Sequence, residues 1–228
     1  ILLVCLLIFP EDFSTSAVLF VTSMLVLFLG RIPLKQIGLL AGIGILVLGG
    51  AFAYVMNSDV QFGRIATMKS RIEAFSNGSD DGGTYQSRQA KIAVARGGFV
   101  GTGPGRSRQK NILPSPFADF IYAIIIEEYG SIFGGLTLVL LYLLLLYRSF
   151  RIVLLTEDPL AALLAIGLAF SLVVQALINM GVAVNILPVT GLALPIVSRG
   201  GTSILFVSIA FGIILSASRT IYPEKENE

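Results

Sequence analysis

The sequence predicts an all-α integral membrane protein: a polytopic helical bundle of about five full spans and one partial span, with a long outer loop and a re-entrant outer segment. Three observations predict this class. Hydrophobic residues make up 55% of the 228 residues, charged residues only 13%, and the mean hydropathy is +0.85. Ordinary soluble domains carry about 25% charged residues. The apolar residues also gather in runs of about 18 residues or more, long enough for a helix to cross a bilayer.

The membrane elements follow from these apolar runs in chain order. They are a partial span over 1–9, full spans over 13–30, 37–56, 120–147, 160–180 and 204–218, and a charged tail over 222–228. The first run has no basic segment or cleavage site before it, so we expect the chain to begin inside a membrane segment. The run over 181–200 is apolar but contains Pro and Gly residues that interrupt helices, and it predicts a re-entrant or irregular segment.

Lys and Arg in the short connections predict the orientation, because such residues stay on the cytoplasmic side. They are Arg31, Lys35, Arg148, Arg151, Arg219 and Lys225. Alternation of the spans places all six on one side. The long polar segment over 57–118 and the re-entrant segment then fall on the outer side, within a single membrane domain over 1–228.

The outer polar segment is itself basic. Its cations are Arg64, Lys69, Arg71, Arg88, Lys91, Arg96, Arg106, Arg108 and Lys110, and its anions are Asp59, Glu73, Asp80 and Asp81. Residues 97–105 are rich in glycine, which lets successive backbone N–H groups turn toward one anion. The candidates for binding a phosphate or pyrophosphate are Arg96, Gly103, Gly105, Gln109 and Lys110. A solvated basic loop without a ligand is the simpler alternative, and both stay open.

Composition removes several kinds of chemistry. The chain has no His, which excludes a Ser-His-Asp triad, a His base and a His-bound metal. Cys5 is its one cysteine, which excludes a disulfide framework and a cysteine zinc site. A carboxylate is then the natural general base. Asp119, at the outer mouth of the span over 120–147, is the candidate catalytic residue, although aspartate is also favoured there as a helix N-cap.

Two further carboxylates, Glu127 and Glu128, lie deeper in the same expected helix, about 12–14 Å from Asp119. Carboxylates at membrane depth are costly and mark either a function or an internal partner. Neighbouring helical residues diverge by about 100°, so we expect that the two glutamates do not share one site. Gln175 and Asn179, one turn apart in the fourth full span, are candidate partners or interhelical hydrogen-bond donors.

The re-entrant segment carries the last group of candidates. Irregular backbone at membrane depth is tolerated where it lines a cavity or is buried in protein. Its final residues lead into a helix, whose N-terminal N–H groups suit an anion. The candidate substrate-binding residues here are Pro195, Ser198, Gly200, Gly201 and Ser203.

Three long stretches resemble one known family. NILPVTGLALPIVSRGGTSILF (185–206) and YQSRQAKIAVARGGFVGTGPGRSRQKNILPSPFADFIYAIIIEEYG (85–130) are similar to signature motifs of the SEDS family (shape, elongation, division and sporulation; FtsW, RodA and SpoVE), most closely its FtsW branch. FPEDFSTSAVLFVTSMLVLFLG (9–30) looks like the family's Pro-Asp-Leu-Gly-Thr region and the following helix. The resemblance covers nearly the whole chain and implies the C-terminal half to three-fifths of a ten-span protein.

The resemblance implies a peptidoglycan glycosyltransferase of the bacterial cytoplasmic (inner) membrane with an extracytoplasmic active face. Such an enzyme polymerises lipid II and works with a class B penicillin-binding protein, a transpeptidase, and other division proteins; no nucleic acid is expected. Asp119 falls on the family's catalytic aspartate. It would deprotonate the acceptor's 4-hydroxyl, which attacks the donor's anomeric carbon, and undecaprenyl pyrophosphate would leave with inversion. A divalent cation (Mg²⁺ or Mn²⁺) is expected to help through unknown ligands, and the chain alone is expected to be inactive.

The chain departs from the family pattern at four positions near the two motifs. Ser115 stands where Glu is frequent, Phe117 and Ala118 replace the His-Thr before the aspartate, and Arg199 replaces a Tyr. These departures bear on the geometry around Asp119 and on substrate preference. They do not bear on the fold.

Two other function classes are weighed against the enzyme. A transporter, such as a lipid II flippase, would suit Glu127, Glu128 and a discontinuous outer segment. A scaffold for division proteins would explain the helices but not a carboxylate beside a basic, glycine-rich loop. The candidate chemistry lies at the outer face, whereas a transporter site is expected near the midplane, and this favours the enzyme.

Overall fold

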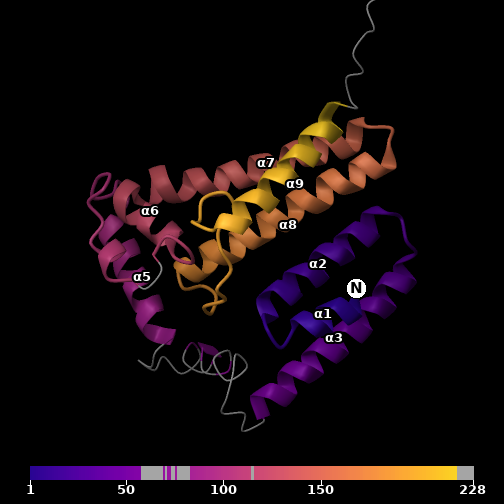
Figure 1. The fold of residues 1–228 in the computed structure, drawn as a ribbon, viewed down its shortest axis with the longest axis horizontal. Helices are drawn as coiled ribbons and strands as arrows, with labels where there is room; N and C mark the ends of the chain where they lie inside the picture. Colours follow the sequence, from indigo (N-terminus) through magenta and orange to yellow (C-terminus); the bar gives the residue numbers. More distant parts are fainter. Residues whose placement is uncertain (58–68, 70, 73–74, 76–82, 114–115, 220–228) are drawn as a thin grey trace, which may run out of the picture.

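The computed structural model describes residues 1–57, 69, 71–72, 75, 83–113 and 116–219, and the regular elements in these ranges are all helical (Figure 1). They are α1 (Leu2–Ile8), α2 (Phe13–Leu29), α3 (Leu34–Asn57), α5 (Gly83–Gly97), the 3₁₀ turn η1 (Gln109–Asn111), α6 (Ile121–Gly130), the π-helical η2 (Ser131–Leu136), α7 (Thr137–Leu155), α8 (Pro159–Ala183) and α9 (Gly201–Arg219). The predicted all-α polytopic class is confirmed. The charged tail and Ser115 lie outside the described residues.

The helices occupy the predicted apolar runs to within a few residues, except at the end of the third span. There α7 continues to Leu155, so Arg148 and Arg151 lie in its last turns and not in the connection that the sequence predicts. Four stretches are long and apolar enough to cross a membrane, namely 34–53, 121–155, 159–183 and 201–219, and α2 is a shorter apolar helix. The helix starts follow ordinary capping chemistry. The Asp12 carboxylate accepts a hydrogen bond from Thr15 N at 3.1 Å, and Asp158 accepts one from Leu160 N at 2.9 Å just before Pro159.

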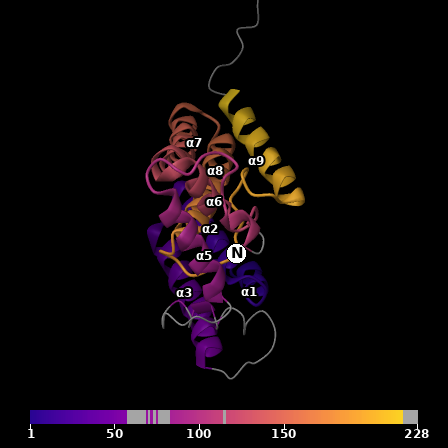
Figure 2. The same cartoon turned by 90° about the vertical axis from the view of Figure 1, so that its left-hand side faces the viewer.

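Helix α8 is the centre of the arrangement. It packs against α7, α9 and α2, and α2 in turn contacts α1 and α3 (Figure 1). The α2–α3 and α7–α8 connections and the end of α9 lie at one end of the molecule, while α5, α6 and the segment after α8 lie at the other (Figures 1 and 2). The described basic connections therefore share one end, as the alternation of spans predicts.

The predicted third span is not a single helix. It breaks at Gly130, which has φ +83° and separates α6 from η2 and α7. A Cβ at Gly130 would lie 2.3 Å from the carbonyl oxygen of Phe99, and one at Gly101 would lie 2.3 Å from that of Glu128. The backbone of the segment after α5 therefore packs directly against the backbone at the end of α6. There Ser131 N donates a hydrogen bond to Gly98 O at 2.9 Å.

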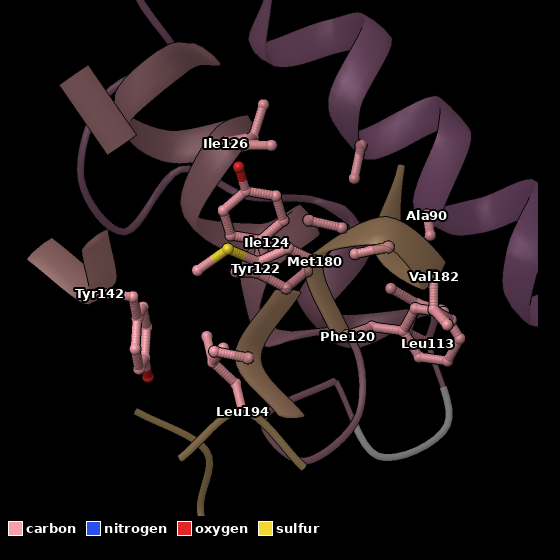
Figure 3. Close-up of a cluster of buried hydrophobic side chains, with 14 of the residues drawn as sticks. Ala90, Leu113, Phe120, Tyr122, Ile124, Ile126, Tyr142, Met180, Val182 and Leu194 are labelled. Carbon is pink, nitrogen blue, oxygen red and sulfur yellow. The ribbon is translucent and has the colours of Figure 1, made fainter. Parts of the chain in front are cut away.

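The outer segment, predicted only as a long polar loop, contains the helix α5. This helix is polar on average, but its residues Ser87, Ala90 and Ala93 form a narrow buried face. This face packs against α6, and Ala90 and Ala93 join a buried cluster with residues of α6, α7 and α8 (Figure 3). In that cluster Phe120 and Leu113 lie together beside Val182, so the core continues directly beneath the start of α6 (Figure 3).

The segment between α8 and α9 is irregular, as its Pro and Gly content predicts, and it turns back along α8. The Gln175 side-chain amide donates to Ala193 O at 3.0 Å. Gln175 lies eight residues before the end of α8 at Ala183, or about 12 Å along the helix. The Tyr142 hydroxyl of α7 donates to Pro195 O, which ties the same segment to a second helix.

The glycine contact between residues 97–101 and α6 gives a test of the fold. We expect Gly101→Ala to lower the melting temperature of the purified full-length protein more than Gly98→Ala does. Both glycines have positive φ, +91° and +53°, and the left-handed strain costs about 1–2 kcal/mol in each case. A Cβ at Gly98 meets nothing within 4 Å, whereas one at Gly101 overlaps the backbone of α6. Equal melting temperatures in a thermal-unfolding assay would contradict this packing.

Candidate functional site

Asp119 lies in the turn immediately before α6, and its side chain does not cap that helix. The N-cap residue is Phe120, and no side-chain hydrogen bond caps the helix start. The alternative that Asp119 serves as the N-cap is therefore wrong. Its carboxylate accepts no hydrogen bond from the described part of the chain and is partly exposed, so it is available to a ligand.

The backbone around Asp119 is held by three hydrogen bonds from distant segments. Arg199 N donates to Phe117 O at 2.8 Å, and the Ser198 hydroxyl donates to Ala118 O at 2.5 Å. Asn179 Nδ2 donates to Asp119 O at 2.9 Å. Three successive carbonyls are thus fixed by α8 and by the irregular segment, and Asp119 is presented on a rigid turn.

The same donors also organise the irregular segment. Asn179 Nδ2 makes a second bond, to Leu192 O at 2.6 Å, and the Ser198 hydroxyl accepts from Leu194 N at 2.8 Å. Asn179 and Ser198 are both buried. The structure therefore brings together three residues singled out in the sequence: Asp119, Asn179 and Ser198. Asn179 does not contact the glutamates of α6 for which it was a candidate partner.

Burial raises the pKa of Asp119 above its ordinary value of 3.8, and the positive charge of Arg71 lowers it in part. The Arg71 guanidinium also faces the irregular segment, 3.8 Å from where a Cβ of Gly191 would stand. The sequence placed Arg71 only among the cations of the outer segment, because no periodicity or motif links it to Asp119. It is the site residue that sequence reasoning missed.

The glycine-rich segment and the residues after it surround the carboxylate of Glu127, an anion that belongs to the protein itself. Glu127 is fully buried in α6. Its carboxylate accepts from Arg96 Nη1 and from Arg108 N, both at 3.1 Å, and from Gln109 N at 3.3 Å. The Ser107 hydroxyl is a fourth donor. Two of the five residues predicted to bind a phosphate, Arg96 and Gln109, are thus engaged by Glu127.

Other parts of this loop stay at the surface. Gly103 and Gly105 have φ of +103° and +74°, and Lys110 Nζ donates to Gly105 O at 2.7 Å. The side chains of Arg106 and Arg108 are exposed. Glu128 lies 3.4 Å from Ser107 N, so both glutamates reach the same loop residue, contrary to the expectation from their 100° divergence on the helix.

The remaining candidates follow Ser198 directly. Gly200, Gly201 and Ser203 form the lead-in and first turn of α9, which begins at Gly201. The first N–H groups of a helix have no partner within it, so this turn offers donors next to the segment that holds Asp119.

The residues around Asp119 do not form a protein ligand set for a divalent cation. In the ranges that the structure describes, no three Asp, Glu, Cys or His side chains come together. Arg71 adds positive charge to the surroundings of Asp119, which disfavours a further cation there.

Comparison with known proteins decides the family. The model of the cell cycle protein family FtsW, RodA and SpoVE matches residues 1–222. This chain belongs to that family. It is 35% identical to the stage V sporulation protein E of Bacillus subtilis (strain 168) over 91% of the chain and 55% of that protein. It is 36% identical to a probable peptidoglycan glycosyltransferase FtsW of Alkalilimnicola ehrlichii over 92% of the chain and 51% of that protein.

A solved structure agrees with this assignment. The chain superposes on a protein from a structure described as "Structural coordination of polymerization and crosslinking by a peptidoglycan synthase complex", with a TM-score of 0.70 and 25% identity, covering 96% of this chain and 59% of that one. The FtsW, RodA and SpoVE fold is therefore present over nearly the whole chain. The chain spans about half the length of the curated relatives it matches.

The hydrogen bonds to the Glu127 carboxylate allow a test of the structural role of Glu127. We expect Glu127→Gln to speed amide hydrogen exchange in residues 102–111, because the substitution puts an NH₂ group against backbone donors and leaves Arg96 without its partner. A buried donor that loses its acceptor costs about 1–3 kcal/mol, and the Ser107 hydroxyl and the N–H groups of residues 108 and 109 all point at Glu127. The matched control is Glu128→Gln, which loses one 3.4 Å contact and should leave exchange nearly unchanged. Equal exchange in both variants would show that Glu127 does not anchor the loop.

Proposed function

We propose that this chain carries the catalytic aspartate of a peptidoglycan glycosyltransferase that polymerises lipid II into glycan strands during cell division. The observation that carries the proposal is the presentation of Asp119: its backbone is held by Asn179, Ser198 and Arg199, while its carboxylate is left without an internal hydrogen bond in the described chain. Relatives named probable peptidoglycan glycosyltransferase FtsW support the reaction class.

In the proposed reaction Asp119 acts as a general base. It takes the proton from the 4-hydroxyl of the acceptor sugar as that oxygen forms a bond to the anomeric carbon of the donor. The bond from the anomeric carbon to the pyrophosphate oxygen breaks, and undecaprenyl pyrophosphate leaves with inversion. A raised pKa suits the task, because a base is most effective when its pKa lies nearer the working pH.

The substrate contacts divide into direct and indirect ones in this proposal. Lys110, the exposed side chains of Arg106 and Arg108, and the first turn of α9 are open to a pyrophosphate. Arg96 and Gln109 act indirectly, because they hold Glu127 and thereby shape the loop. The expected Mg²⁺ or Mn²⁺ finds no ligand cluster among the described residues.

The proposed setting is the outer face of the bacterial cytoplasmic membrane, beside a class B penicillin-binding protein and other division proteins. The basic connections at the opposite end from Asp119 support this orientation. The matched complex, described by the words polymerization and crosslinking, supports a transpeptidase partner. Because the chain spans about half the length of its relatives, the activity belongs to the full-length protein, and we expect no polymerisation by residues 1–228 alone.

The observed contacts weaken the case for a transporter. That alternative depended on intramembrane glutamates lining a path for substrate or ions. Glu127 is instead fully enclosed by Arg96, Ser107 and two backbone N–H groups. A scaffold likewise gives no reason for a half-buried carboxylate that accepts no hydrogen bond from the described residues.

The decisive test is lipid II polymerisation by the full-length protein with its transpeptidase partner. We expect Asp119→Asn to lower the rate by about 10²–10⁴-fold, the usual contribution of a general base. The matched control is Asp158→Asn, since Asn still caps α8 and lies at the opposite end of the bundle. Normal folding and partner binding should accompany the loss, measured by gel filtration and co-purification. Unchanged polymerisation by Asp119→Asn would refute the assignment.

The electrostatic contact with Arg71 predicts a shift in the pH profile. The base must be deprotonated, so polymerisation should fall as the pH drops through the raised pKa of Asp119. Arg71→Gln removes a charge that lowers this pKa, and the acidic limb of the rate profile should move to higher pH. Lys91→Gln, at an exposed position of α5, should leave the limb in place. A limb that stays fixed in Arg71→Gln would remove Arg71 from the site.

A further inference from the structure

A groove lies between α7 and α9 at the end of the bundle opposite Asp119. It encloses about 430 Å³. Its apolar walls are formed by Leu145, Ile152 and Leu155 of α7 and by Phe211, Ile214 and Leu215 of α9. Helix α9 rests mainly on α8 and touches α7 little, which leaves this space between them (Figure 2).

The groove continues along the helices toward the irregular segment. A second hollow of about 260 Å³ shares Leu145 and Phe211 with the first and reaches Tyr142 and Val197. The two together form an apolar trough along α7 and α9. A trough of this shape suits a hydrocarbon chain lying parallel to the helices.

The polar features of the groove are gathered at its far end. Arg148 and Arg151, three residues apart and so on one face of α7, both line it. Neither makes an ion pair with a described residue, and both are exposed. Ser149 lies between them and is fully buried, yet its hydroxyl has no hydrogen-bond partner in the described chain. Because a ligand in the groove cannot touch so enclosed a hydroxyl, the two guanidinium groups are the charged groups that the groove offers.

We propose that this groove binds an anionic phospholipid of the cytoplasmic leaflet. The phosphate lies against Arg148 and Arg151, and an acyl chain follows the trough toward Phe211. Basic pockets between membrane helices on the cytoplasmic side bind such headgroups. The proposal is independent of the glycosyltransfer reaction, because the groove and Asp119 lie at opposite ends of the bundle.

Charge complementarity favours this occupant over the alternatives. A second apolar helix would cover the trough but would give the two guanidinium groups no anionic partner. The polyprenyl chain of a substrate at the outer face carries its pyrophosphate at the other end of the bundle, away from Arg148. An anionic phospholipid matches both the apolar trough and the two arginines.

The test is native mass spectrometry of the full-length protein titrated with phosphatidylglycerol or phosphatidylcholine. We expect the wild type to retain phosphatidylglycerol preferentially, and Arg148→Gln/Arg151→Gln to lose this preference about tenfold or more. Arg31→Gln/Lys35→Gln is the matched control, since it removes two exposed cations from the same end of the bundle but not from the groove. Equal retention of the two lipids by the wild type would overturn the proposal.

A second pair of variants tests the trough itself. Leu215 lines the groove and is 63% exposed, while Leu205 on the same helix is 59% exposed and does not line it. We expect Leu215→Trp to reduce phosphatidylglycerol retention and Leu205→Trp to leave it unchanged; both changes are at the surface and spare the core. Equal retention in both variants would overturn the proposal. So would a disulfide between Leu215→Cys and a cysteine placed in a span outside this chain, because the groove would then be filled by protein.

Discussion

Burial of the Glu127 carboxylate is the constraint on which the outer end of the molecule depends. A charge taken out of water needs donors close by, and α6 supplies none at this depth because its own N–H groups are bonded within the helix. The donors come from the segment that precedes Asp119: Arg96, the Ser107 hydroxyl and the N–H groups of residues 108 and 109. These hydrogen bonds connect the segment before Asp119 to the helix after it, so the turn that contains Asp119 is anchored on both sides.

Glycine residues allow the segment after α5 to lie directly against α6. The donors reach Glu127 only if the segment after α5 runs against the backbone of α6, and at Gly97, Gly101 and Gly130 a Cβ would lie within 2.3 Å of a backbone oxygen. The break of the long helix at Gly130 belongs to the same arrangement, since its φ of +83° creates the surface on which residues 98–100 rest. The burial of Glu127 and the break of the long helix at Gly130 therefore depend on the same backbone contact.

The sequence predicted the apolar helices because hydrophobic runs of sufficient length admit few other structures in a bilayer. It predicted the irregular segment after α8 for the same reason, from its Pro and Gly residues. Three features escaped it. Helix α5 has only a narrow buried face of Ser and Ala, the partners of Glu127 lie 18 to 31 residues away in the chain, and Arg71 meets Asp119 only through tertiary packing. A glycine-rich basic segment indicates an anion, but spacing alone does not reveal whether that anion is a ligand or a side chain of the same protein.

The hydrogen bonds that hold Asp119 in place do not depend on the side chains beside it in the chain. All three bonds that fix the turn end on backbone carbonyls, and at residue 199 the donor is also backbone. The side chains of Phe117, Ala118 and Arg199 therefore take no part in these three hydrogen bonds. The side chains of Phe117 and Arg199 are exposed instead. Substitution of Phe117 or Arg199 should therefore leave these backbone contacts, and with them the position of Asp119, in place.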